Sequence, residues 1–372
     1  MTVPLSILDL APISEGADAA TALRNTVDLA QHAELWGYKR YWIAEHHFVA
    51  VASSSPAVLI GQIAAATSRI RVGSAAVQLG FTTSVAVAEA FGTLAAFHPD
   101  RIDLGLGRSG QRRAQAAQSQ PVAPPAAPPA WRDVSGVVVP PPFDVSAVMR
   151  SPKMRATLSV LQQPGAVAPD FAVQVDDILA MFGGDFQADG FGLNAVPGEG
   201  AGLTPWIFGS SKGESALVAG GRGLPFVASY HITPGTALEA IEAYRAAFTP
   251  SAYLPEPYVV VSADVVVADD TATARHLASS YGHWVHAVRT GAGAVPYPDP
   301  DTREPLSETE LGAVKDRTAT QFVGDPDEVA HQLDTLRQVA GADELVVTSV
   351  THRHADRLRS HELIAKRWGL TG

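Results

Sequence analysis

The chain has 372 residues and a formal net charge of −11, from 38 acidic and 27 basic side chains. No cluster of Lys and Arg is present that would bind a polyanion, so the composition argues against a nucleic-acid partner. Cysteine is absent, which excludes disulfides, thiolate nucleophiles and cysteine-based metal sites.

The amino terminus enters the apolar stretch 5–10 without a basic leader, and no apolar run reaches the length of a membrane span. These features predict a protein that stays in the cytoplasm and has no membrane partner. From there on, apolar strands alternate with amphipathic helices. The predicted strands are 5–10, 40–45, 69–77, 101–108, 206–208, 225–230, 258–268 and 344–349, and the predicted helices are 19–36, 56–67, 84–97, 171–182, 212–220, 237–248, 271–288 and 355–368.

One further helix is predicted to begin at Asp325, which acts as the N-cap of the helix. Pro326 takes the first helical position and Glu328 the third, a combination typical of a helix start. This helix would carry Val329 and Leu333 on one face, together with Leu336. It precedes the last predicted strand, as the alternation of strands and helices requires.

Eight strands, each followed by a helix, predict an α/β protein with a closed (β/α)8 TIM barrel as a single domain over residues 1–372. An open doubly wound sheet is the competing architecture. Two segments break the rhythm and are predicted insertions: 111–170 after strand 4 and 290–320 after the helix of strand 7. The first insertion opens with a run rich in Ala, Gln and Pro that has too few large apolar residues to form a core, so we expect it to be mobile.

The second strand ends in Glu45, His46 and His47. The carboxyl ends of barrel strands carry the catalytic side chains in enzymes of this fold. Adjacent strand residues face opposite sides, so both histidines cannot enter one pocket unless the strand has turned, which argues against a two-histidine metal site. One imidazole is a candidate general base or hydrogen-bond donor to a cofactor, and the alternative is a histidine pair satisfied by loop carbonyls.

Small side chains at Ala75 and Ala76 occupy a strand where a barrel interior normally takes Val, Ile or Leu. They would let a flat ligand approach the backbone. The alternative is a tight contact with a helix outside the barrel.

Two segments suit a phosphate. Arg108 ends the fourth strand after Gly105-Leu106-Gly107, and no helix follows, so a dinucleotide fingerprint is not supported. Its guanidinium matches phosphate oxygens, although a solvated surface arginine is the simpler alternative. The second segment, between strand 5 and its helix, offers an anion cradle through Ser210, Ser211, Lys212 and Ser215.

Ser211 and Glu214 could also form a capping box, which is compatible with that cradle. Strands 4 and 5 are neighbours in a barrel, so both segments are expected to hold one phosphate. No nucleophile elbow, Walker loop or His-Glu-x-x-His zinc motif occurs. Nucleophilic hydrolysis and phosphoryl transfer are therefore not supported.

These residues stand in an order that resembles the bacterial luciferase-like monooxygenases, a family of flavin-dependent (β/α)8 barrels. The resemblance covers most of the chain and is carried by segments 37–48, 72–77, 97–108, 209–211, 222–225, 282–284 and 322–326. It implies that His46, next to Glu45, lies beside the flavin ring and stabilises or deprotonates the oxygenated cofactor. It also implies a non-proline cis peptide between Ala75 and Ala76 beneath the ring.

The resemblance further makes Arg108 a phosphate ligand, together with the backbone N–H groups of Ser211 and Lys212 and the hydroxyl of Ser215, in a loop that includes Ser210. The chain departs from the light-emitting members at Gly107, where those carry a reactive cysteine, so light emission is not expected. The insertion that follows Arg108 occupies the region where members place a mobile active-site lid.

The resulting hypothesis is a monooxygenase that uses O2 and reduced FMN, supplied by a separate NAD(P)H-dependent flavin reductase, to oxygenate a small, largely apolar organic substrate. The chain has no nicotinamide fingerprint of its own, and the resemblance implies a homodimer. Members use either FMN or the deazaflavin F420, and the Glu-His-His run favours FMN. The alternatives are F420-dependent hydride transfer, a non-catalytic flavin-binding protein of the same fold, and a metal-dependent barrel hydrolase.

Overall fold

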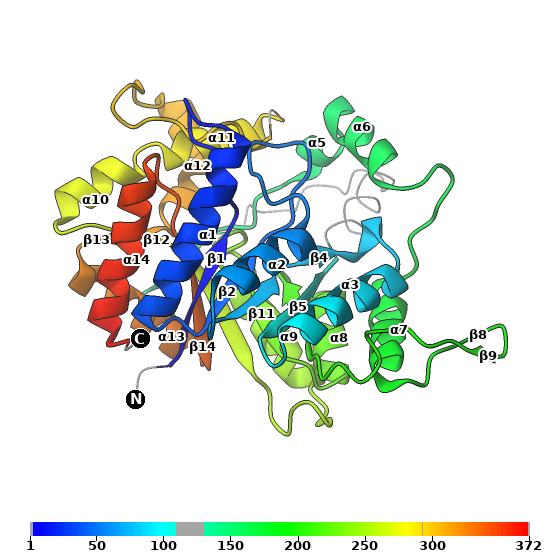
Figure 1. Cartoon of the computed structure of the whole chain (residues 1–372). Helices are drawn as coiled ribbons and strands as arrows, with labels where there is room; N and C mark the ends of the chain where they lie inside the picture. Colours follow the sequence, from blue (N-terminus) through cyan, green and yellow to red (C-terminus); the bar gives the residue numbers. More distant parts are fainter. Residues whose placement is uncertain (1–2, 109–129, 292, 371–372) are drawn as a thin grey trace.

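The computed structural model describes residues 3–108, 130–291 and 293–370 (Figure 1). Most of the Ala- and Pro-rich run that opens the first insertion lies outside these residues, so its predicted mobility and its predicted role as a lid stay predictions. No helix in the described part of the chain combines the length and the apolar character needed to cross a bilayer.

Eight parallel strands close into a barrel, which confirms the (β/α)8 prediction and excludes the doubly wound sheet. Around the ring they are β1 (Leu5–Asp9), β2 (Arg40–Ile43), β3 (Arg71–Ser74), β5 (Ile102–Gly107), β10 (Pro205–Gly209), β11 (Phe226–Ala228), β12 (Val259–Val267) and β14 (Glu344–Thr348). The ring is complete because β14 pairs with β1 and β5 pairs with β10. All carboxyl ends therefore lie on one face of the barrel.

Helices surround the barrel, and Figure 1 shows α1 and α14 running side by side outside β1. The helices that follow the barrel strands are α1 (Ala19–Trp36), α2 (Pro56–Ala66), α3 (Ser84–Phe97), α7 (Phe171–Gly183), α8 (Glu214–Gly221), α9 (Ala237–Ala247), α10 (Thr271–Ala278), α13 (Pro326–Ala340) and α14 (His354–Trp368). The predicted start of α13 is confirmed, since Asp325 and Glu328 form the capping box. Its predicted apolar face, Val329, Leu333 and Leu336, is fully buried.

Two predicted elements are interrupted. The strand predicted at 69–77 is divided into β3 and β4 (Val77–Gln78), the cis peptide between Ala75 and Ala76 lies between them, and η1 (Leu79–Phe81) follows. The helix predicted at 271–288 is divided into α10 and α11 (Tyr281–Arg289). The first of these helices ends with Ser279 as its C-cap, and both the backbone N–H and the hydroxyl of Ser279 donate to the carbonyl of His276.

Both insertions contain regular structure. The first holds the hairpin β6 (Arg132–Val134) and β7 (Val137–Val139) and the helices α5 (Ser146–Met149) and α6 (Pro152–Leu161), and a second hairpin, β8 (Gln187–Ala188) and β9 (Phe191–Gly192), follows α7. The second insertion holds α12 (Glu308–Thr318), and β13 (Phe322–Gly324) then pairs with β12. The prediction missed α12, although its capping box, Ser307 and Glu310, is visible in the sequence.

A buried ion network closes the amino end of the barrel. The guanidinium of Arg40 lies 2.7 Å from the carboxylate of Asp103 and 3.2 Å from that of Glu344, which also accepts a 2.5 Å hydrogen bond from Ser6. The Trp206 ring lies 4.5 Å from the same guanidinium. The interior is therefore filled at this end, which leaves the opposite end for a ligand.

Glycines on two strands make room for large interior side chains. A Cβ on Gly73 would lie 2.6 Å from the ring of Trp42, and one on Gly105 would lie 1.9 Å from the carbonyl oxygen of Ser74 and 2.6 Å from the ring of Phe208. Trp42 and Phe208 pack edge to face, with centroids 5.3 Å apart. The packing of these two rings thus depends on the absence of a Cβ at Gly73 and Gly105.

We expect the stability of the protein to fall as the pH drops below about 6.5. His361 on α14 is 1% exposed, and burial lowers its pKa to about 3. An unfolded histidine takes up a proton near pH 6.5 and the folded one does not, so each such group removes up to about 1.4 kcal/mol per pH unit between these values. Urea unfolding measures the decrease in the free energy of unfolding between pH 7 and pH 5. This decrease should be smaller for His361→Gln than for the wild type. Equal decreases would show that His361 does not cause the loss of stability.

Candidate active site at the carboxyl end of the barrel

His46 lies three residues beyond the end of β2. Trp42 and Ala44 lie in the interior apolar cluster, and His46 continues their alternation. Across the barrel, His231 follows β11 and is 9% exposed. Burial, followed by the charges of Arg317 and His46, lowers the pKa of His231 to about 3. The two imidazoles are thus within electrostatic reach of each other, and His231 is neutral at physiological pH.

Glu45 and His47 point the other way, as the strand alternation predicts. Glu45 Oε1 lies 2.9 Å from Nε2 of His47, and its Oε2 accepts a 3.0 Å hydrogen bond from the backbone N–H of Gln78. In turn, Nε2 of the Gln78 side chain donates a 2.7 Å hydrogen bond to the backbone carbonyl of Glu45. Glu45 therefore anchors β4, the segment that follows the cis peptide.

The wall beside His46 consists of small groups. The predicted non-proline cis peptide between Ala75 and Ala76 is confirmed. The neighbouring strand contributes Gly107, where a Cβ would lie 3.1 Å from the Cβ of Ala76. Methyl groups and a glycine thus meet on adjoining strands, and the flat-ligand site suggested by the sequence stays a prediction.

Arg108 and the start of α8 come together, as predicted for neighbouring strands. Arg108 Nη1 lies 2.5 Å from Oε2 of Glu214, the first residue of α8. The predicted helix start at 212 is wrong by two residues, because Gly213 is the N-cap. The alternative capping box between Ser211 and Glu214 does not form, and no side chain caps the first turn.

The remaining predicted residues are arranged around this helix start. Hydroxyls of Thr233 and Thr236 donate to the carbonyl of Ser210 and hold its loop. Ser215 packs on the end of β10, since a Cβ on Gly209 would lie 3.2 Å from its Cβ. Lys212 is 73% exposed, and its Nζ lies 3.7 Å from Glu239 rather than at the helix start.

This donor set fits a phosphate. A guanidinium, uncapped backbone N–H groups at a helix start and a nearby serine hydroxyl all favour an anion. The carboxylate of Glu214 opposes an anion at this position and would have to give up its contact with Arg108 for one to bind. Among the described residues, no group of three or more His, Asp or Glu side chains is placed to hold a metal ion.

Sequence reasoning missed a polar group on the other wall of the barrel. Nδ1 of His231 lies 2.5 Å from Oγ of Ser262 on β12. Two residues further along β12, Asp264 accepts a 2.5 Å hydrogen bond from the hydroxyl of Tyr281, and Arg317 of α12 lies 3.4 Å from the same oxygen. Polar residues directly after the apolar strand β11 were a usable signal for His231, as they were after β2.

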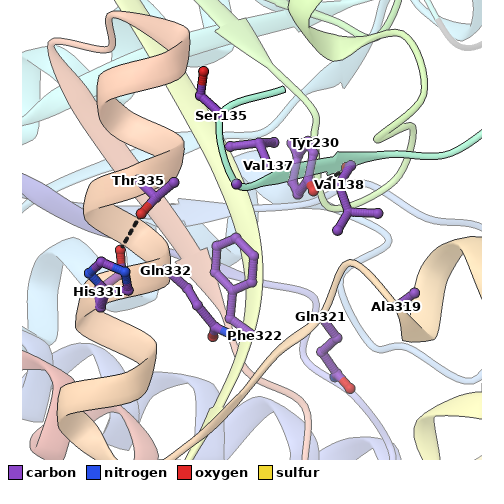
Figure 2. Close-up of a pocket in the computed structure, with 11 residues that line it drawn as sticks. Ser135, Val137, Val138, Tyr230, Ala319, Gln321, Phe322, His331, Gln332 and Thr335 are labelled. Carbon is purple, nitrogen blue, oxygen red and sulfur yellow. Dashed lines mark hydrogen bonds between the residues drawn. The ribbon is translucent and has the colours of Figure 1, made fainter. Parts of the chain in front are cut away.

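Two cavities lie close to these elements. One of about 380 Å³ is formed by the hairpin turn before β7, the helix α13 and the segment that leads into β13 (Figure 2). Tyr230, which precedes His231, borders it and donates a 2.7 Å hydrogen bond to the carbonyl of Val138. The other cavity, of about 240 Å³, is bordered by Glu45 and His47. Neither is lined by His46, Arg108 or Ser215.

The profile of the luciferase-like monooxygenase family matches residues 3–130 and 175–344. The uncharacterized protein YvbT of Bacillus subtilis (strain 168) is 37% identical over 368 residues, which cover 98% of this chain and 96% of that protein. The luciferase-like monooxygenase of Escherichia coli (strain K12) is 34% identical over 367 residues, covering 97% and 96%. The solved structure of apo-MsnO8 is 30% identical with a TM-score of 0.77, covering 99% of both chains.

The fold alone is shared with proteins that bind different cofactors. One, at 17% identity, is the oxygenating constituent of 3,6-diketocamphane monooxygenase from Pseudomonas putida in complex with FMN. Another, at 14% identity, is an F420-dependent secondary alcohol dehydrogenase. The family match covers most of the sequence and agrees with the barrel. The chain belongs to the luciferase-like monooxygenase family and is an oxidoreductase.

Proposed function

We propose that this protein is a two-component monooxygenase that binds reduced FMN at the carboxyl end of its barrel and oxygenates a small organic substrate with O2. The observation that carries the proposal is the pairing of an anion site with a small-residue wall. Arg108 and the uncapped start of α8 suit the phosphate, while Ala75, Ala76 and Gly107 suit a flat ring.

Different residues of the chain would bind the phosphate and handle the proton. Arg108, the backbone N–H groups of the α8 start and Ser215 would hold the phosphate, with Ser210, Ser211 and Lys212 supplying the loop. His46 would hold or move a proton at its imidazole beside the ring, and Glu45 would act as a positioning residue through Gln78. When bound, the reduced flavin supplies the electrons that activate O2.

A separate NAD(P)H-dependent reductase is part of the proposal, as are a homodimer and a cytoplasmic location. F420-dependent hydride transfer is the second candidate, supported by the fold shared with an F420-dependent enzyme. The two cofactors differ in the group attached to the phosphate and in their reaction with O2. A titration with both reduced cofactors, with and without O2, separates the candidates.

Arg108→Ala should weaken the binding of reduced FMN by about 30- to 100-fold, because hydrogen bonds from a charged donor to the phosphate are lost. Riboflavin lacks the phosphate, so its weaker binding should not change. Glu214→Gln is the matched control, since it removes the carboxylate that holds Arg108 and should tighten FMN binding. Anaerobic titration followed by the quenching of tryptophan fluorescence measures these three affinities.

A wild-type protein that binds neither reduced FMN nor reduced F420 would end the proposal. Tight binding of F420 alone, without O2 consumption, would favour hydride transfer. Equal losses for FMN and riboflavin in Arg108→Ala would show that the phosphate lies elsewhere.

A further inference from the structure

Asp264 lies at the centre of a polar cluster at the carboxyl end of the barrel. Its Cα pairs in register with that of Thr348 on β14, and Val260 pairs in the same way with Glu344, one of the residues that fill the interior. Side chains two and four residues apart on a strand share a face, so Asp264 and Thr348 both point into the barrel. Both are buried, at 5% and 1% exposed.

Three polar atoms around Asp264 are buried and have no hydrogen-bond partner in the described part of the chain. They are Nε of Arg317, the hydroxyl of Tyr297 and Oγ1 of Thr348. Arg317 contacts Asp264 directly, and Tyr297 is close enough that Asp264, after burial, contributes to its raised pKa. Buried polar groups are almost always paired, so three unpaired ones around a single residue require an explanation.

The chemistry of these atoms defines the missing partner. The Nε of an arginine can only donate a hydrogen bond, and both hydroxyls can donate. The pKa of Arg317 is raised, because its contacts with Tyr281 and Asp264 outweigh burial, so the guanidinium stays charged. Burial raises the pKa of Asp264, which favours its uncharged form beside an anion. A negatively charged oxygen group would accept from all three donors and form the stronger, charge-assisted bond with arginine.

The position of the cluster ties it to the proposed reaction. His231 lies 2.5 Å from Ser262 on β12, two residues before Asp264, and, after burial, the charges of Arg317 and His46 both act on its pKa. Arg108 and α8, the proposed phosphate site, follow β5 and β10, whereas Asp264 and Thr348 lie on β12 and β14 across the ring. The unpaired donors therefore belong to a different part of the site from the phosphate.

We propose that Arg317, Tyr297 and Thr348 form a subsite that binds the carboxylate or a similar oxyanion of an organic substrate. The inference rests on the proposed function, because the subsite is assigned to the substrate of the same enzyme. The substrate is then an organic acid with an apolar body, which refines the largely apolar molecule expected from the sequence.

The test uses the full chain without flavin and three probes of equal chain length: octanoate, octane-1-sulfonate and octan-1-ol. Isothermal titration should show that the wild type binds at least one of the two anions, and that Arg317→Met weakens this binding about 10-fold or more. Binding of octan-1-ol should be the same in both proteins. Tyr297→Phe keeps the buried volume and should weaken anion binding several-fold, so the test survives if Arg317→Met fails to fold.

Arg289→Met is the matched control, since Arg289 pairs with Asp316 next to Arg317 and is equally well enclosed. It should leave anion binding unchanged. The ratio of FMN to riboflavin affinity should be the same in Arg317→Met and the wild type, which separates this subsite from the phosphate site.

The inference is overturned if the wild type binds neither anion, or if Tyr297→Phe and a folded Arg317→Met bind both anions as the wild type does. Failure of the wild type to bind FMN would reject the proposed function and leave the anion result to be judged separately.

Discussion

Replacing His46 with alanine is expected to lower substrate-dependent turnover by about 100- to 10,000-fold, the range that a positioned acid or base contributes. The imidazole continues the interior alternation of Trp42 and Ala44 and lies at the end of β2, so its removal takes away the proton-handling group beside the proposed flavin site. The binding of reduced FMN should change little, because the phosphate contacts come from other strands.

The measurement is product formation from a panel of small organic acids, with reduced FMN supplied by a separate reductase. His47→Ala is the control, because His47 points away from the interior and pairs with Glu45. It should keep turnover within a few-fold of the wild type. A loss in His47→Ala as large as that in His46→Ala would mean that the anchor of β4, rather than the imidazole of His46, is what matters. If His46→Ala keeps full turnover, the protein uses another group.

The largest expected effect on stability comes from Arg40→Met, which should lower the free energy of unfolding by about 3–5 kcal/mol. Arg40 is the cation between Asp103 and Glu344, and the side chain of Glu344 is completely buried. Without Arg40, Glu344 keeps only uncharged donors such as Ser6 and Tyr258. Asp103 still has Arg71, so the penalty falls mainly on Glu344.

Urea unfolding of Arg40→Met measures this difference. Arg359→Met is the surface control, since Arg359 is 43% exposed and pairs with the exposed Asp269. It should cost no more than about 1 kcal/mol. Similar losses in the two variants would show that the amino-end network contributes no more than a surface ion pair.

The fold could be read from the sequence because each barrel strand buries both faces and each following helix shows one apolar face. The interruptions of the predicted strand at Ala75 and of the predicted helix at Ser279 could not be predicted from this apolar pattern. The cis peptide at Ala75 follows from the family resemblance and not from the residues themselves. Residues 271–288, predicted as one helix, form two helices separated at the C-cap Ser279.

Only part of the candidate site could be predicted from the sequence. Residues that directly follow strands, such as His46 and Arg108, could be predicted because barrel topology alone brings them to one face. Arg317 could not, since it lies on a helix inside an insertion and its burial is decided by packing against β12. Asp264 could not be predicted either, because it lies within a long run of Val on the same strand.

The glycines of β3 and β5 limit how this enzyme can diversify. Any larger residue at position 73 or 105 would collide with backbone or with the Trp42 and Phe208 rings, so the inner lining of these strands is closed to change. We therefore expect changes of specificity to arise mainly from the connecting segments above the barrel, which include α12 with the proposed subsite residue Arg317. A library that varies those segments and keeps both glycines should yield folded proteins with altered substrate choice far more often than one directed at the lining.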